Sequence, residues 1–177
     1  ALAVAPLVFG QAPLPDWSVL GQASGIGAGT ARCAAAFDDG GGARLYVGGS
    51  FSDTQSGAAA NLARFDGYGS GWSALGAGVD GTVFALHAHG GALIAGGAFA
   101  HAGGLAAPGV ARWDGHAWSA LGTGLSGTVY ALTSFDDGSG AALYAGGSFT
   151  LPSTGLPTHL ARWDGAQWSA VGGGCDG

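Results

Sequence analysis

A phrase of four parts that returns along the chain constrains the fold more than any other feature. One part, Trp-Ser-Xaa-Leu/Val-Gly, begins at Trp17, Trp72, Trp118 and Trp168, so its copies lie 55, 46 and 50 residues apart. Between these copies, three other short parts return in the same order. One of them ends in a glycine pair, which is Gly48-Gly49, Gly96-Gly97 or Gly146-Gly147. Such self-similarity indicates an array of similar structural units.

Each part has the composition of a β-strand, because it is rich in Val, Leu, Tyr, Phe and Trp and is bounded by Gly, Asp or Ser. No segment keeps the apolar period of a helix. In the third repeat the predicted strands cover 129–135, 143–150, 159–164 and 168–171. Four antiparallel strands every ~40–50 residues make a propeller blade. We therefore expect an all-β, β-propeller-type array of four-stranded antiparallel blades, with three blades plus one extra N-terminal outer strand.

The blades are expected at about 29–76, 81–122 and 127–172, in a single β-propeller repeat domain over residues 13–177. The extra strand consists of Trp17, Ser18, Val19 and Leu20. Three blades do not easily close a ring, and their open edges and apolar faces invite association. Two interpretations follow. Either the blades open a longer propeller, or several chains join head to tail, with the extra strand completing the next copy.

Residues 1–12 have the pattern of a signal-peptide remnant, or else form an N-terminal extension. Residues 1–9 are almost wholly apolar, and small residues at Gly10 and Ala12 fit a cleavage site after Ala12. No other apolar run reaches the ~18 residues that a membrane helix needs. The sequence therefore predicts an exported, secreted or cell-surface protein without a membrane span.

A family resemblance rests on three features in a fixed order: the glycine pair, an aromatic-Asp pair and a following Trp. The aromatic-Asp pairs are Phe65-Asp66, Trp113-Asp114 and Trp163-Asp164. This order resembles the kelch repeat, and the fuller phrase is similar to secreted bacterial tandem-repeat proteins and to the propeller of fungal cortical polarity-marker proteins. The resemblance implies propeller blades. It implies no single activity, because propellers serve as scaffolds, binding modules and enzymes.

Several repeated residues are expected to hold the blades together. Trp72, Trp118 and Trp168 are large apolar anchors of the core between blades, with sugar stacking on an exposed Trp as the alternative. Arg64, Arg112 and Arg162 each stand two residues before an aspartate, and residues i and i+2 of a strand share a face. Each arginine is therefore expected to pair with its own aspartate (Asp66, Asp114 or Asp164) or with that of an adjacent blade.

Few residues of the sequence suggest a metal site or a reactive group. His87 and His89 share one face of a predicted strand and are weak candidates for a metal site, although no carboxylate or cysteine spacing supports one. We therefore expect no metal and no cofactor. Cys33 and Cys175 are the only cysteines, and either a disulfide or a buried free thiol fits Cys33. A disulfide involving Cys175 would lock a junction between blades or between chains.

The charge and composition of the chain disfavour several classes of binding partner and activity. The net charge is −6 without a basic cluster, which disfavours nucleic acid. The sequence contains no Glu and no Lys. It therefore lacks the commonest catalytic carboxylate of glycosidases and the amine that Schiff-base chemistry needs. We therefore expect a secreted non-enzymatic structural or binding protein that self-assembles into a ring or filament, or recognises a glycan or protein surface. The alternatives are a lectin-like propeller and, third, a fragment of a larger propeller enzyme.

Overall fold

The computed structural model describes residues 27–54, 57–67 and 70–172. These residues form three four-stranded antiparallel sheets and two short hairpins, without a helix. The all-β prediction with four-stranded antiparallel sheets is therefore confirmed. The predicted extra strand at 17–20 lies outside the described residues.

Each sheet follows the chain from its first strand to its last. The first sheet has the order β1 (Gly29–Asp38), β2 (Ala43–Phe51), β5 (Leu62–Gly67) and β6 (Gly71–Ala74). The second has β7 (Thr82–His89), β8 (Ala92–Ala98), β11 (Val110–Trp113) and β12 (Trp118–Ala120). The third has β13 (Ser126–Asp136), β14 (Ala141–Thr150), β15 (Pro157–Trp163) and β16 (Trp168–Ala170). The hairpins pair β3 (Asp53–Thr54) with β4 (Gly57–Ala58), and β9 (His101–Ala102) with β10 (Leu105–Ala106).

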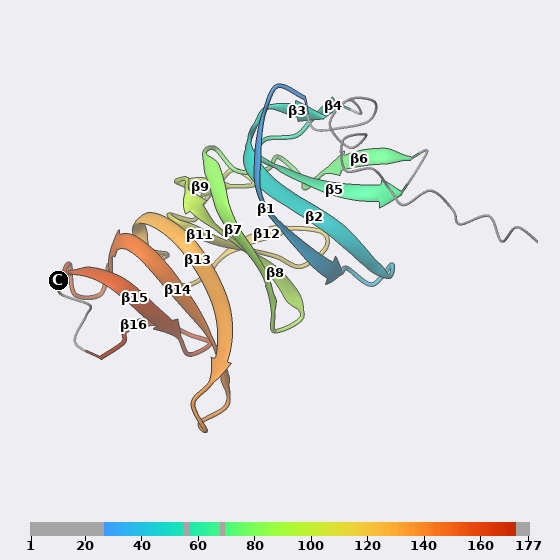
Figure 1. The fold of residues 1–177 in the computed structure, drawn as a ribbon. Coiled ribbons are helices and arrows are strands. Elements are labelled where there is room, and N and C mark those ends of the chain that lie inside the picture. The colour runs from blue at the N-terminus through green and yellow to red at the C-terminus, as the bar shows by residue number, and fades with distance from the viewer. Residues whose placement is uncertain (1–26, 55–56, 68–69, 173–177) are drawn as a thin grey trace, which may run out of the picture.

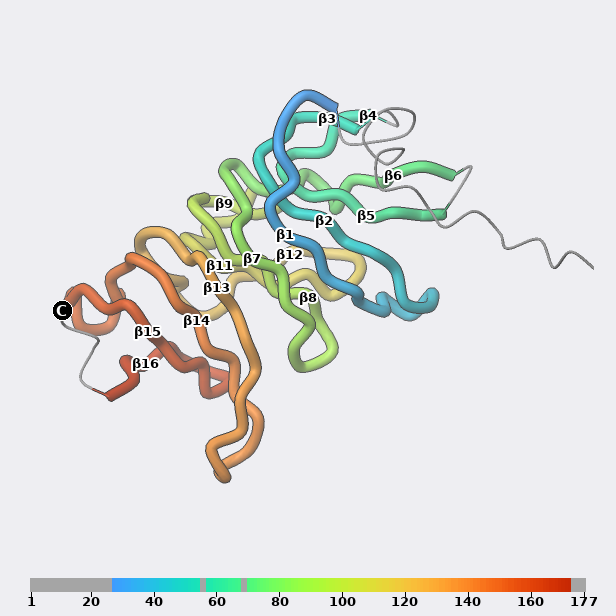
Figure 2. The backbone as a smooth tube through the Cα atoms, in the orientation of Figure 1, coloured from blue at the N-terminus to red at the C-terminus, as the bar shows by residue number. Residues whose placement is uncertain are grey.

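The three sheets stack face to face in chain order, with β7 between β1 and β13 (Figures 1 and 2). Side chains alternate between the two faces of each strand. In β8, Leu93 and Ala95 belong to a core cluster shared with the first sheet, whereas Ala92 and Ile94 belong to one shared with the third. The second sheet is therefore buried on both faces.

The glycine pair sets how closely the sheets approach. A Cβ at Gly48 would lie 2.6 Å from Cγ1 of Val83, and one at Gly96 would lie 2.7 Å from Cγ1 of Val129. Each valine belongs to the first strand of the next sheet. Any larger residue at these glycines would force the sheets apart. At Gly146, by contrast, the nearest atom to such a Cβ lies 3.8 Å away, because no described strand covers that face.

Tryptophans also tie successive sheets together. The indole Nε1 of Trp118 donates to the carbonyl of Leu75 at 2.8 Å, and that of Trp168 donates to the carbonyl of Leu121 at 3.2 Å. Each bond joins a last strand to the residues that follow the last strand of the preceding sheet. Trp72 occupies the same repeat position and is buried in a separate cluster, on the face of the first sheet that points away from the second.

The indole bond of Trp118 can be tested against a matched neighbour. Trp113 is equally buried, but its Nε1 has no hydrogen-bond partner among the described residues. Both Trp→Phe changes lose similar packing, while only Trp118→Phe loses a hydrogen bond and only Trp113→Phe relieves an unsatisfied donor. We expect Trp118→Phe to be less stable than Trp113→Phe by about 2 kcal/mol in urea unfolding. Equal stabilities would show that the indole bond contributes nothing.

Candidate functional site

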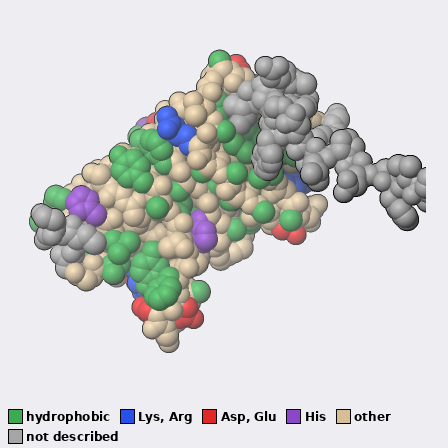
Figure 3. Space-filling view, in the orientation of Figure 1, with side chains coloured by type: hydrophobic (Ala, Val, Ile, Leu, Met, Phe, Trp, Pro, Cys, Tyr) green, Lys and Arg blue, Asp and Glu red, His purple; other side chains and the backbone are tan. Residues whose placement is uncertain are grey.

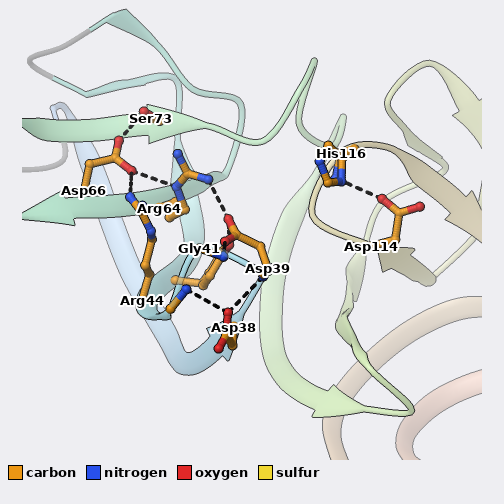
Figure 4. A network of polar contacts seen from close by, with 12 residues as sticks. Asp38, Asp39, Gly41, Arg44, Arg64, Asp66, Ser73, Asp114 and His116 are labelled. Carbon is orange, nitrogen blue, oxygen red and sulfur yellow. Dashed lines mark hydrogen bonds and ion pairs between the residues drawn. The ribbon is translucent and has the colours of Figure 1, made fainter.

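A network of ion pairs fills one end of the first sheet (Figure 4). The guanidinium of Arg64 donates from Nε to Asp66 and from Nη1 to Asp39, both at 2.7 Å. Arg44 donates to Asp66 at 2.9 Å. The Tyr46 hydroxyl donates to Asp39 at 3.0 Å, and the hydroxyl of Ser73 donates to Asp66. The expected arginine–aspartate pairing is therefore present in this repeat.

The network holds both of its carboxylates ionised. Burial raises the pKa of Asp39, but the donated bonds from Tyr46, Gly41 and Arg64 outweigh it, so the pKa lies below its ordinary value. Asp66 has the same balance, with Ser73 and Arg64 as the main donors. Burial, followed by the bond to Asp39, raises the pKa of Tyr46 to about 12.

The other two repeat arginines have no such pairs. Asp114 accepts the backbone N–H groups of His116 and Ala117, and Asp164 accepts those of Ala166 and Gln167. These aspartates stabilise their own turns, as Figure 4 shows for Asp114 and His116. No ion pair of Arg112 or Arg162 exists within 27–54, 57–67 and 70–172. The expected pairing is therefore absent in the second and third repeats.

A pocket of about 510 Å³ opens where these arginines lie, between the second and third sheets. Its lining includes Arg112 and His89 from the second sheet, Arg162 and Trp163 from the third, and Leu121 between them. Trp163 is half-buried, whereas Trp72, Trp113, Trp118 and Trp168 are buried. Among the described tryptophans, Trp163 is thus the one with a ring available to a ligand. Sequence reasoning missed this pocket.

The two candidate metal ligands contact a serine. Nε2 of His87 and Nδ1 of His89 lie 2.8 and 2.7 Å from the hydroxyl of Ser134, on β13. Burial, with a smaller contribution from His89, lowers the pKa of His87. In the described part of the chain, no group of three or more His, Cys, Asp or Glu side chains is placed to hold a metal ion. The two imidazoles join the second sheet to the third.

Of the two cysteines, the structure describes Cys33 alone. Cys33 is a free, half-buried thiol, and burial raises its pKa to about 11. Its ordinary thiol form therefore dominates at neutral pH, which makes it a poor nucleophile. Cys175 lies outside the described residues, as does the assembly segment at 17–20.

A row of side chains that the sequence did not predict runs along the first strands of the sheets. Each first strand has a β-bulge, and the extra residues are Arg32, Phe84 and Tyr130. The guanidinium of Arg32 lies 5.3 Å from the ring centre of Phe84, which lies 5.4 Å from that of Tyr130. A cation–π contact and a tilted ring pair thus continue from sheet to sheet.

The outer face of the third sheet carries apolar side chains over β13 and β14, beside the acidic turn that joins these strands (Figure 3). Phe135 is 59% exposed and packs edge-on against Tyr144, with ring centres 6.0 Å apart. Among the described strands, none packs on this face. It is therefore an apolar face of the described stack that a further blade would bury.

Comparison of the chain with protein-family models, curated proteins and solved structures found no match. The described residues include no helix of the length and apolarity needed to cross a membrane.

The network around Arg64 is expected to stabilise the fold. The equivalent Arg112 of the second sheet, which has no ion pair with a described residue, is expected to contribute little. Arg64→Gln leaves Asp39 and Asp66 partly buried without their shared cation, so we expect a loss of about 3 kcal/mol. Arg112→Gln is the matched control, and we expect it to cost less than about 1 kcal/mol. Chemical denaturation of both variants measures the difference. Equal losses would contradict the structural role of the network.

The lowered pKa values of Asp39 and Asp66 also predict an acid dependence. Their stabilisation is fully present above the unfolded-state pKa and is lost as pH falls through the folded-state values. The unfolding free energy of the wild type should therefore start to fall as pH drops toward about 4, the ordinary aspartate pKa, and should keep falling at lower pH, through the lowered folded-state values. The fall should be shallower in Asp39→Asn, which keeps only one of the two carboxylates, Asp66, to protonate. An equally steep fall in the variant would rule out this linkage.

Proposed function

We propose that this protein is a secreted, non-enzymatic repeat scaffold that acts by head-to-tail association with a second copy of itself. The observation that carries the proposal is the outer face of the third sheet. This face repeats the pattern by which the first and second sheets bind the sheets that follow them.

In each sheet, one face points toward the place of the next sheet, and these three faces can be compared position by position. Tyr46 and Ile94 are buried to 0% and 2% exposure, whereas Tyr144 in the third sheet is only half-buried. Leu62 and Val110 are fully buried, and their equivalent Leu160 is also half-buried. The missing side chain of each glycine leaves a notch in this face. Valines of the next sheet fill the notches at Gly48 and Gly96, but none fills the notch at Gly146. The apolar positions of a blade junction are thus in place without their partner.

The complementary surface on the second copy is the outer face of β1. Ala31, Ala34 and Ala36 are exposed there, at the positions where the next two sheets carry Val, Leu and a small residue. Ala31 stands in the register of Val83 and Val129, so its methyl would only partly fill the notch at Gly146. We therefore expect a junction of the same geometry as the internal ones, but a weaker one.

The blade number favours a dimer. Propellers usually have about four to eight blades, and six is the one multiple of three in that range. Two copies joined head to tail twice would close a six-bladed ring. Each copy would then use the outer face of its third sheet and the outer face of its β1 once.

Light scattering on a sizing column tests the proposal. We expect a concentration-dependent species of twice 17.0 kDa. Tyr144→Asp should shift it to monomer, because the junction would bury a carboxylate without a partner. Leu105→Asp is the control, since Leu105 is 53% exposed on β10, away from the junction, and the change adds the same charge. A monomer at all concentrations would refute self-association, and equal effects of both variants would refute the outer face of the third sheet as its junction.

Strengthening the junction gives an independent test. Ala31→Val adds two methyl groups in the register where Val83 and Val129 fill the glycine notches. At about 0.8 kcal/mol per buried carbon, each junction should tighten about tenfold. We expect the dissociation constant of the dimer to fall by at least that factor, measured by sedimentation. Unchanged or weaker association would show that this face of β1 is not the partner surface.

A further inference from the structure

Arg112 differs from Arg64 because the turn before it is shorter. In the first sheet the β1–β2 turn contains Asp38-Asp39-Gly40, and Asp39 binds Arg64. In the second sheet His89 pairs directly with Ala92, with only Gly90-Gly91 between them. The second sheet therefore has no carboxylate at the place that Asp39 occupies in the first. Ile94, which has no hydroxyl, stands at the position of Tyr46.

The aspartate of the same repeat does not replace the missing carboxylate. Asp114 directs Oδ1 at the N–H groups of His116 and Ala117, at 2.9 and 2.8 Å. The guanidinium of Arg112 consequently has no hydrogen bond or ion pair with any described residue. It lines the pocket as a half-buried cation that acts on the nearby Asp114 carboxylate only through space, without a hydrogen bond to it.

A second guanidinium lines the same pocket. Nη2 of Arg162 donates to the hydroxyl of Ser139 at 3.2 Å, while its Nε is buried without a partner among the described residues. The carboxylate of Asp164 also lines the pocket, but its Oδ1 accepts the N–H groups of Ala166 and Gln167, both at 2.8 Å, and it acts on Arg162 only through space. Two cations with unused donors thus converge on one cavity, in a chain whose net charge is −6.

We infer that this pocket binds a small molecule that carries a carboxylate or a phosphate group. The planar fork of a guanidinium matches the oxygens of both groups, and a partly buried arginine without a partner gains most from such a ligand. The half-buried ring of Trp163 and the side chain of Leu121 form an apolar wall beside the arginines. The volume of about 510 Å³ is in the range of small-molecule sites.

The pocket lies between two sheets of one chain, so this inference does not depend on self-association. Arg112 is the residue of choice for the test, because it lines the pocket and its guanidinium has no hydrogen bond or ion pair with a described residue that the change would remove. Arg32 offers a matched control, since it is an exposed arginine on the bulge of β1, outside the lining of the pocket.

Calorimetric titration at low ionic strength tests the inference with three probes: glucuronate, inorganic phosphate and the neutral sugar glucose. We expect at least one anion to bind and glucose not to bind. Arg112→Gln should weaken the binding about tenfold or more, as loss of a charge-assisted hydrogen bond predicts. Arg32→Gln should change it less than about twofold. Arg162→Gln is a second variant, for which we also expect weaker binding.

Three results would overturn the inference. One is no binding of either anion at concentrations up to about 10 mM. Another is equal binding of glucose and glucuronate. The last is undiminished anion binding in both Arg112→Gln and Arg162→Gln, with folding of each variant verified by circular dichroism. Binding of phosphate without glucuronate, or the reverse, would support the inference and identify which oxyanion the pocket prefers.

Discussion

The stack depends on the absence of one side chain at each junction. At Gly48 and Gly96 the next sheet places a valine Cγ1 within 2.7 Å of where a Cβ would lie. The other contacts between the sheets need this close approach. The indole of Trp118 reaches Leu75, and that of Trp168 reaches Leu121, only because the sheets lie at this spacing. The row from Arg32 through Phe84 to Tyr130 likewise needs neighbouring first strands at a fixed separation.

The repeat preserves packing, whereas its turns determine the chemistry. The three arginines occupy one strand position, yet Arg64 is bound by two carboxylates and Arg112 by none. The difference arises in the turns, where Asp39 is present in the first sheet and absent from the shorter turn of the second. The first junction is therefore filled by a charged network, and the second contains a pocket with cations. Identical blades would have had identical junctions and no such site.

The strands were predictable because apolar alternation and turn residues recur in every repeat. The predicted strand 143–150 falls within β14, which begins at Ala141. The bulges were not predictable, since a bulge is a mismatch of register between two strands and leaves no mark in either strand alone. The pairing of Arg112 was mispredicted because spacing on a strand says which face a side chain takes, but not whether Asp114 binds its own turn instead. The short Gly90-Gly91 turn was the available signal.

The two ends of the stack differ, so the proposed association would join unlike faces, and its rotation would decide between a ring and a filament. A contact between unlike faces has a direction, so an open row of copies always keeps one free end of each kind until a ring closes. A junction made with Ala31 in place of valine is weak by itself. In a closed ring, however, the second junction forms within an already joined pair, at a high effective concentration, so two weak contacts act together. Such a ring opens only when both junctions fail, whereas an open filament loses its terminal copy through a single weak contact.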